Sequence, residues 1–288
     1  VHDREYIRSL KVEIDGGGGW LDSDTYASPG SWDAALYAAG GLMNATDRVM
    51  KKEVDNAFAL VRPPGHHAVR PHQMGFCLFN NVAVTAKYAL SNYNIKRILI
   101  IDFDVHHGNG TQEAFYTDSQ VMYFSTHEYP WYPFTGAAEE TGQGAGECYN
   151  VNVPLEADLG DKEYLQAFNE ILVPVARRLQ PELMLISAGY DAHWQDSISN
   201  MNVTTMGFAR MAKIIKAISD ELCPNRLVYT LEGGYHRQAL AYSVTATFDL
   251  LMGNSEVYDP LGAPPMAYSP KDFDDFVKKI RSIHKLKD

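Results

Sequence analysis

The sequence is poor in cysteine and has neither a long apolar run nor a cluster of basic residues. Its cysteines, Cys77, Cys148 and Cys223, lie far apart and form no Cys-x-x-Cys pair. A disulfide framework and a thiolate zinc site are therefore disfavoured, and a reducing compartment fits best. No apolar run approaches the roughly 18 residues of a membrane span, so we expect no membrane partner. Because a basic nuclear-localisation-like run is also missing, the sequence predicts a cytoplasmic protein.

Positive charge is in deficit, since Asp and Glu total 36 against 25 Lys and Arg, and the formal net charge is −11 at pH 7. An acidic surface repels phosphate backbones, so we expect no direct nucleic-acid partner, whereas a cationic substrate would be tolerated. The chain starts at Val1 without an initiator Met, and its first residues lack the apolar core of a signal peptide. We therefore expect further residues upstream of Val1.

Short apolar runs alternate with helical patterns along most of the chain. We predict strands over 57–61, 97–101, 121–124, 183–186 and 227–231, and helices over 81–91, 161–179, 204–222 and 238–251. Continuous apolar strands are typical of a parallel sheet that is covered on both faces. The alternation predicts a single doubly wound α/β domain over 1–288, with a mostly parallel sheet and helices on both faces. The glycines at 16–19 predict a flexible surface loop.

Chemically active residues follow the first and last predicted strands. The segment 62–67 reads Arg-Pro-Pro-Gly-His-His, a stiff turn that presents two adjacent imidazoles, His66 and His67, of the residue type most used for acid–base work near neutral pH. After the last strand comes Glu-Gly-Gly-Tyr at 232–235. Paired glycines let the backbone turn close to a site and bring the hydroxyl of Tyr235 inward. The alternatives are structural histidines and a packed aromatic ring.

The strongest pattern is Asp102, Asp104 and His106, which alternate with apolar residues and so face the same way from an extended segment. A carboxylate at the end of a buried strand is costly to desolvate unless it is paired or binds a cation. Asp191 follows another apolar strand and supplies a third carboxylate. Nitrogen and oxygen ligands suit zinc, and also Mn, Fe or Co. The pattern therefore predicts a metal site, with a hydrogen-bonded structural cluster as the alternative.

In this order and context, the segments 62–67, 75–77, 102–110, 188–193 and 232–235 resemble the zinc-dependent histone deacetylase superfamily. That superfamily includes bacterial acetylpolyamine amidohydrolases and acetoin-utilisation-type proteins, and the resemblance runs from about Asp22 to Leu251. It implies an arginase/deacetylase-like fold whose usual first strand would lie upstream of Val1. The implied reaction hydrolyses an N-acetyl amide, of acetyl-lysine or of an acetylated polyamine or small amine, to acetate and free amine.

The resemblance also implies the metal sites. Zinc, with iron or cobalt as possible replacements, would be held by Asp104, His106 and Asp191. A structural potassium ion would be held by Asp102, Asp104, His106 and Ser125.

The resemblance further implies roles in catalysis and substrate binding. His67 would be the general base and then the general acid, and His66, hydrogen-bonded to Asp102, would be its electrostatic partner. Tyr235 would donate a hydrogen bond to the oxyanion. Asn109 stands behind the second tandem histidine, where some relatives have an aspartate, and this is a class II-like feature. The substrate would be bound by the walls, floor and rim of a tunnel formed by Phe76, Tyr132, Gly75, Gly233 and Asp24.

Two other functions compete with this one. An arginase-like binuclear ureohydrolase is suggested by Asp191-Ala192-His193, but Asp196 lies one position too late for that motif and the companion Gly-Gly-Asp-His segment is missing. A non-catalytic acetyl-lysine-binding module would be expected to lose the tyrosine or a metal ligand, and neither is lost. The partner is therefore expected to be an acetylated peptide or a small-molecule amine.

Overall fold

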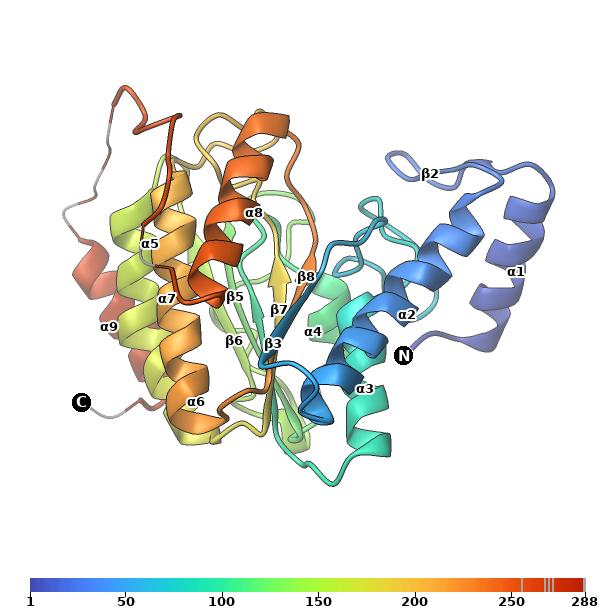
Figure 1. Ribbon diagram of the computed structural model, residues 1–288, viewed down its shortest axis with the longest axis horizontal. Helices are drawn as coiled ribbons and strands as arrows, with labels where there is room; N and C mark the ends of the chain where they lie inside the picture. Colours follow the sequence, from blue (N-terminus) through green and yellow to red (C-terminus); the bar gives the residue numbers. More distant parts are fainter. Residues whose placement is uncertain (255, 267, 269, 271, 287–288) are drawn as a thin grey trace.

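A six-stranded parallel sheet lies at the centre of the molecule, between two layers of helices (Figure 1). The structure is a computed structural model, and it describes residues 1–254, 256–266, 268, 270 and 272–286. The strands of this sheet are β3 (Asn56–Ala59), β4 (Ile98–Asp102), β5 (Val121–Glu128), β6 (Asn150–Leu155), β7 (Leu183–Ala188) and β8 (Leu227–Leu231). Their order is β3-β8-β7-β4-β5-β6, and every neighbouring pair is parallel. The predicted doubly wound α/β fold is confirmed.

The central strands are the ones that the apolar runs predicted. Every residue of β4, β7 and β8 is buried, as expected for branched apolar strands that are covered on both faces. Strand β6 was not predicted, because Asn150 and Asn152 alternate with valines and give it a polar appearance. Both side-chain NH2 groups donate to Gln112 Oε1, so the amide donors of these residues have partners inside the protein.

Two groups of helices cover the two faces of the sheet (Figure 1). One face packs on α2 (Ser31–Met50), α3 (Asn81–Asn92) and α4 (Asn109–Phe115). The other packs on α5 (Asp161–Ala167), α6 (Val173–Leu179), α7 (Thr205–Leu222), α8 (Arg237–Leu251) and α9 (Phe273–Ile283). Helices α2, α4 and α9 were not predicted, and nor was α1 (Arg4–Asp15), which packs on α2 at the edge of the molecule. The pair Gly40-Gly41 weakens the helical pattern of α2.

The predicted helix over 161–179 is a continuous helical run with a π-helical turn, Phe168–Leu172, between α5 and α6. Pro174 lies just after this turn and has no backbone N–H, so it cannot continue the regular hydrogen-bond pattern. A wide turn accommodates the missing donor while Phe168, Ile171 and Leu172 stay buried against the sheet.

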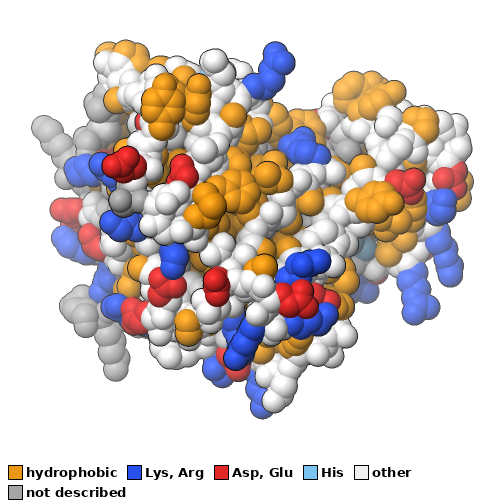
Figure 2. All heavy atoms as spheres, viewed as in Figure 1, with side chains coloured by type: hydrophobic (Ala, Val, Ile, Leu, Met, Phe, Trp, Pro, Cys, Tyr) orange, Lys and Arg blue, Asp and Glu red, His pale blue; other side chains and the backbone are white. Residues whose placement is uncertain are grey.

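The glycine-rich segment forms a tight turn after α1 and leads into a small antiparallel pair, β1 (Gly19–Trp20) with β2 (Tyr26–Ala27). The rings of Trp20 and Tyr26 pack edge to face with centroids 5.4 Å apart, and both side chains are exposed. Figure 2 shows hydrophobic side chains gathered over this hairpin, at the upper right, while charges of both signs cover the lower part of the same face. The predicted loop is therefore partly a strand.

The parallel arrangement brings five loops to one edge of the sheet. These loops follow the carboxyl ends of β3, β4, β5, β7 and β8 and span residues 60–80, 103–108, 129–149, 189–204 and 232–236. Sheets of this type carry their sites at this edge. No helix in the part of the chain that the structure describes is both long and apolar enough to cross a membrane.

Candidate active site

A cavity of about 310 Å³ opens at the carboxyl edge of the sheet. It is lined by Asp24, Pro64, His66, His67, Gly75, Phe76, Asp104, His106, Trp131, Tyr132, Phe134, Ile198, Gly233 and Tyr235. All of the predicted substrate-binding residues are in this lining, and so are the tandem histidines and the tyrosine. Asp102, Asn109 and Asp191 lie behind this lining, and each contacts one of its histidines. Ser125, the remaining predicted residue, is next to Asp102 in the sheet.

Asp104, His106 and Asp191 meet at the floor of the cavity, with one ligand atom from each lying within 4.8 Å of the others. His106 Nδ1 is 3.1 Å from Asp104 Oδ1 and 3.3 Å from Asp191 Oδ2. All three side chains are buried. Among the described residues, none donates a hydrogen bond to Asp191 Oδ2. A buried carboxylate oxygen without a donor, beside an imidazole and a second carboxylate, fits a bound cation.

The remaining oxygens of these carboxylates are fixed by backbone amides. Val105 N donates to Asp191 Oδ1 over 3.0 Å, and Gly233 N donates to Asp104 Oδ2 over 2.8 Å. Gly233 has to be a glycine, because a Cβ there would collide with Asp191 Oδ2. Burial and the charge of Asp104 raise the pKa of Asp191 to about 6. Two adjacent buried carboxylates repel each other, and a cation between them would remove that repulsion.

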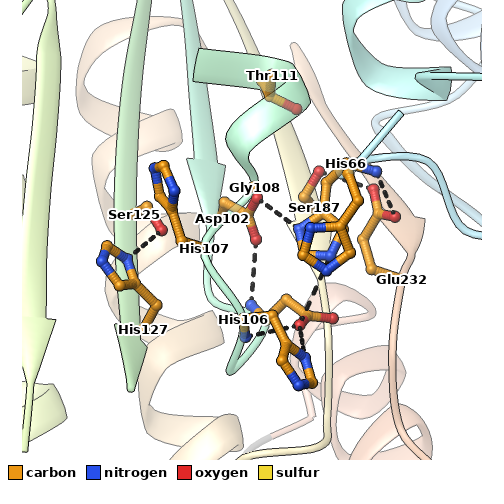
Figure 3. A network of polar contacts seen from close by, with 12 residues as sticks. His66, Asp102, His106, His107, Gly108, Thr111, Ser125, His127, Ser187 and Glu232 are labelled. Carbon is orange, nitrogen blue, oxygen red and sulfur yellow. Dashed lines mark hydrogen bonds and ion pairs between the residues drawn. The ribbon is translucent and has the colours of Figure 1, made fainter. Parts of the chain in front are cut away.

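The tandem histidines are held by Glu232, whose part in the site the sequence did not reveal. Its Oε2 accepts hydrogen bonds from Gly65 N (2.7 Å) and His66 N (3.2 Å), and its Oε1 accepts one from Ser187 Oγ (2.9 Å). Figure 3 shows this carboxylate beside His66. Burial raises the pKa of Glu232 to about 7. The loop after β3 is thereby fastened to the ends of β7 and β8.

His66 and His67 are adjacent and both buried, yet their pKa values move in opposite directions. Burial lowers the pKa of His66, but the charges of Asp104 and Asp102 outweigh it and raise that pKa to about 10. Burial, with the neighbouring His66 and His106, holds the pKa of His67 well below its usual value. The carboxylates therefore favour the protonated form of His66, and burial favours the neutral form of His67.

The hydrogen bonds of His67 assign its tautomer. Its Nδ1 lies 2.9 Å from Asn109 Oδ1, and the amide nitrogen of Asn109 faces His67 O and Met74 Sδ. Because an amide oxygen only accepts, Nδ1 carries the proton and Nε2 keeps its lone pair. His67 thus offers a basic nitrogen in the cavity that it lines.

Asp102 lies one layer behind the cavity. Its Oδ2 is 3.1 Å from His66 Nδ1 and accepts a hydrogen bond from the Tyr123 hydroxyl over 3.0 Å. Asp102, Asp104 and His106 converge on one region as the alternation predicted, although Asp102 supports His66 while the other two face the cavity. Ser125 is paired with Asp102 in the register of β4 and β5, and its Oγ contacts His127 Nδ1 at 2.9 Å.

Aromatic rings form the walls of the cavity. Tyr132 packs edge to face on His67 and on His106, with centroids 5.2 and 6.0 Å apart, and Phe76 packs on Tyr235 at 5.8 Å. Burial, with the charges of Asp191 and Asp104, raises the pKa of Tyr235, which keeps its hydroxyl protonated. The site therefore combines a cation-binding floor, a neutral imidazole and a phenolic donor, which together can hydrolyse an amide.

The rim of the cavity is built around Gly75 and Asp24. Gly75 has φ +58°, and a Cβ there would collide with the ring of His67. Asp24 Oδ1 accepts from Gly75 N over 3.2 Å and from the Thr25 hydroxyl over 3.0 Å. Phe134, which the sequence analysis did not single out, stands at the mouth with φ +65° and 74% exposure. Its sequence neighbourhood gives no sign of this placement.

The residues that suggested a binuclear site lie elsewhere. His193 stacks on Phe208, and its Nε2 is 3.4 Å from Thr205 Oγ1. Asp196 accepts hydrogen bonds from the backbone amides of Tyr235 and His236. Within the described residues, Asp104, His106 and Asp191 are the one group of three or more that could hold a metal. A second metal beside them would have no ligand from His193 or Asp196.

Three comparisons with known proteins give matches over most of the chain. A family model described as "Histone deacetylase domain" matches residues 1–251, which extends the predicted resemblance to the start of the chain. "Histone deacetylase 14, chloroplastic" from Arabidopsis thaliana is 40% identical over 299 residues, covering 99% of this chain and 71% of that protein. A protein named "Probable deacetylase" from Archaeoglobus fulgidus is 46% identical over 244 residues, which cover 84% of this chain and 67% of that protein. The crystal structure of the HDA15 HD domain matches with a TM-score of 0.89 at 38% identity, over 99% of this chain and 76% of that one.

Proposed function

This chain belongs to the histone deacetylase family, and from that premise we propose that it hydrolyses the acetyl amide of an N-acetylated amine in a zinc-dependent reaction. The products are acetate and the free amine. The observation that carries the proposal is the buried group of Asp104, His106 and Asp191, which lies at the floor of the same cavity that His67 and Tyr235 line.

Asp104, His106 and Asp191 would hold the zinc ion through one carboxylate oxygen, one imidazole nitrogen and a second carboxylate oxygen. Iron or cobalt would suit the same ligands. When bound, the metal supplies Lewis-acid polarisation of the acetyl carbonyl and lowers the pKa of water. The orphaned Asp191 Oδ2 supports this assignment.

His67 acts as the general base and then as the general acid. Its Nε2 takes a proton from the attacking water and later returns a proton to the leaving amine. The low pKa of His67, caused first by burial, keeps this nitrogen free at neutral pH. His66, protonated beside Asp102, stays charged and contributes electrostatically.

Tyr235 donates a hydrogen bond to the oxygen that gains negative charge during the attack. A donor placed where charge develops is worth about 3–4 kcal/mol in other hydrolases. The raised pKa of Tyr235, owed to burial and to the carboxylates of Asp191 and Asp104, ensures that the phenol donates and does not ionise.

The cavity shape supports a substrate with a linear stem. Phe76 and Tyr132 give apolar walls for methylene groups, and Gly75 and Gly233 leave room where a Cβ would collide. The Asp24 carboxylate at the rim can accept a hydrogen bond from a peptide N–H or a second amine. Acetyl-lysine in a peptide and an acetylated polyamine both have this form.

Two supporting features belong to the same proposal. A structural potassium ion would be held by Asp102, Asp104, His106 and Ser125, of which Asp102 and Ser125 are paired in the register of β4 and β5 and all four are buried. The acidic balance and three free cysteines favour a cytoplasmic protein that does not bind nucleic acid directly.

The test is acetate release from an acetyl-lysine peptide and from acetylputrescine, with zinc-loaded and chelator-stripped protein assayed side by side. We expect turnover of at least one substrate, loss of turnover after stripping, and recovery when zinc is returned. Asp191→Ala should lose bound metal and activity together, whereas Tyr235→Phe should keep the metal and lose about 100-fold or more in kcat. The proposal is contradicted if chelator-stripped protein releases acetate at the same rate as zinc-loaded protein. It is also contradicted if Asp191→Ala still turns over either substrate.

A further inference from the structure

Asp196 joins two of the loops that build the active site. Its Oδ2 accepts hydrogen bonds from Tyr235 N over 2.6 Å and from His236 N over 2.8 Å. Asp196 belongs to the loop after β7, and the two amides belong to the loop after β8. The carboxylate is buried, with 5% of the residue exposed. Asp196 therefore connects the segment that contains Asp191 to the segment that contains Tyr235, in addition to the backbone hydrogen bond from Tyr190 N to Gly233 O.

The first half of the turn that bears Tyr235 is held by other groups, since Gly233 N donates to Asp104 Oδ2 and Gly233 O accepts from Tyr190 N, whereas the amides of Tyr235 and His236 donate to Asp196. Gly234, directly before it, has φ +130°, a conformation that only glycine adopts easily, and Tyr235 itself is 37% exposed. The ring of Tyr235 packs on Phe76, whose own side chain is also partly exposed. Hydrogen bonds from amides to a carboxylate are about twice as strong as neutral ones. Asp196 thus fixes the second half of this turn, after Gly234.

We propose that Asp196 is a positioning residue for Tyr235, which holds the phenol over the floor of the cavity by fixing the backbone amides at 235 and 236. The inference rests on the proposed role of Tyr235 as the oxyanion donor. A hydroxyl at the end of a tyrosine side chain lies far from its backbone, so a small rotation of the turn displaces it by a larger distance. Misplacement by about 1 Å is enough to cost about 100-fold in rate.

A purely structural role, as the cap of α8, explains the contacts less well. The N-cap of α8 is His236, and its own side chain accepts a hydrogen bond from Ala239 N over 3.2 Å. The helix therefore has a cap of its own, and Asp196 binds the amides that precede the helix. The loop that contains Asp196 is also tied to the metal ligand segment, since Ser199 Oγ donates to Asp191 O over 2.7 Å. The carboxylate fixes Tyr235 relative to Asp191.

The first measurement does not depend on activity. Hydrogen–deuterium exchange is followed in Asp196→Ala, in Asp196→Asn and in a matched control, Asp161→Ala. Asp161 also binds the N-terminus of a helix, accepting from Thr204 N over 2.8 Å, but it does not contact Tyr235. We expect faster exchange over 232–238 in Asp196→Ala, a smaller change in Asp196→Asn, and unchanged exchange over 183–188. Unchanged exchange over 232–238 in Asp196→Ala overturns the inference.

The second measurement is a double-mutant cycle with Tyr235→Phe, in zinc-loaded protein with metal content checked. We expect Asp196→Ala to lower kcat by about 10- to 100-fold with little change in KM, because the lost hydrogen bond acts in the transition state. In the Tyr235→Phe background the same change should alter kcat by less than about threefold, since the donor that Asp196 positions is already gone. Asp161→Ala should lower stability and leave kcat within about threefold of the unmodified protein.

The outcomes separate this inference from the proposed function. If Asp196→Ala lowers kcat as much in the Tyr235→Phe background as it does when the tyrosine is present, then Asp196 does not act through the tyrosine and the inference fails. If the unmodified protein releases no acetate, the proposed function fails, and the exchange measurement still decides whether Asp196 fixes the turn.

Discussion

Two pairs of histidines with rings in contact lie at the carboxyl edge of the sheet, in different electrostatic surroundings. The rings of His66 and His67 have centroids 4.0 Å apart, and those of His107 and His127 have centroids 4.7 Å apart. All four side chains are buried. The first pair borders Asp102 and Asp104, whereas the second contacts neutral groups, Thr135 Oγ1, Gln112 Oε1, Ser125 Oγ and Gly136 O. Figure 3 shows His66 on one side of Asp102 and the second pair on the other.

The pKa values show what this difference does. Burial holds the pKa of His107 well below its usual value and lowers that of His127 to about 4, so the second pair is neutral. In the first pair burial acts in the same direction, but Asp104 and Asp102 reverse it for His66 and leave His67 low. Burial without a neighbouring carboxylate therefore favours two neutral rings. When carboxylates lie beside just one ring of the pair, that ring is charged and its neighbour remains a neutral base. Acid–base chemistry needs such a pair.

The largest expected difference is between two variants, each of which removes one imidazole ring from one of the two pairs. His67→Asn should lower kcat by about 100- to 10,000-fold, the usual range for a general base, with metal content and stability close to those of the unmodified protein. Steady-state kinetics on an acetyl-lysine peptide, with metal analysis, measures this.

The matched change is His107→Asn. Because His107 is hydrogen-bonded to Thr135 and Gln112 and does not line the cavity, we expect a loss of about 1–3 kcal/mol in the free energy of unfolding and less than about tenfold in kcat. Equal losses of kcat in the two variants would mean that the pairs do not differ in function.

A smaller effect comes from giving His67 the kind of neighbour that His66 has. Asn109→Asp places a carboxylate 2.9 Å from His67 Nδ1 if it keeps the position of the amide. A negative charge favours the protonated imidazole, so the pKa of His67 rises and less free base is present at neutral pH. The acid limb of the pH profile of kcat/KM should move upward by about one unit.

The control for this exchange is Asn109→Ser, which puts a neutral hydroxyl at the same position. Its acid limb should stay where it is in the unmodified protein, whatever happens to the maximal rate. If both variants shift the limb equally, the neighbour's charge does not set the behaviour of His67.

The smallest effect tests burial on a histidine outside both pairs. His284, at the end of α9, is fully buried, and neither ring nitrogen has a hydrogen-bond partner among the described residues. Burial and the nearby Arg178 lower its pKa to about 4. The unfolded chain then binds more protons than the folded protein between about pH 6.5 and 4, so stability is present above this window and is lost as pH falls through it. From pH 7 to 5.5 the loss should be about 1 kcal/mol.

Urea unfolding at pH 7 and pH 5.5 measures this loss in the unmodified protein and in His284→Phe, which removes the titrating group from an apolar site. The variant should lose about 1 kcal/mol less than the unmodified protein over the same interval. An identical loss in the two proteins would assign the pH dependence to other groups.

The sequence predicted the parts of this molecule whose signal is local. The strands around Ile98, Leu183 and Leu227 were found because their branched apolar residues are contiguous. Asp104 and His106 were singled out because they alternate with apolar residues at a strand end, and the structure brings them together with Asp191 in a group that could hold a metal. These features depend on residues that are close neighbours along the chain.

What the sequence did not reveal depends on contacts between distant loops. Glu232 holds the amides at 65 and 66, and Asp196 holds those at 235 and 236, yet neither contact leaves a pattern in its own segment. Strand β6 was missed for a related reason, since the partners that make Asn150 acceptable inside the protein come from another element. Hydrogen bonds between residues far apart in the sequence cannot be predicted from the local pattern of apolar and polar residues.

The position of β8 in the sheet has a consequence for the order in which the molecule is built. Strand β3 pairs with β8, and β8 pairs with β7, so the last strand of the sheet to be synthesised lies between the first and the rest. A nascent chain that ends before Leu227 contains Asp104, His106 and Asp191, and β4 and β7 can already pair. Strand β3, which precedes the tandem histidines, has no neighbouring strand in this sheet until β8 is synthesised. Insertion of β8 therefore completes the sheet, places Glu232 beside the amides at 65 and 66, and brings Tyr235 in the same step.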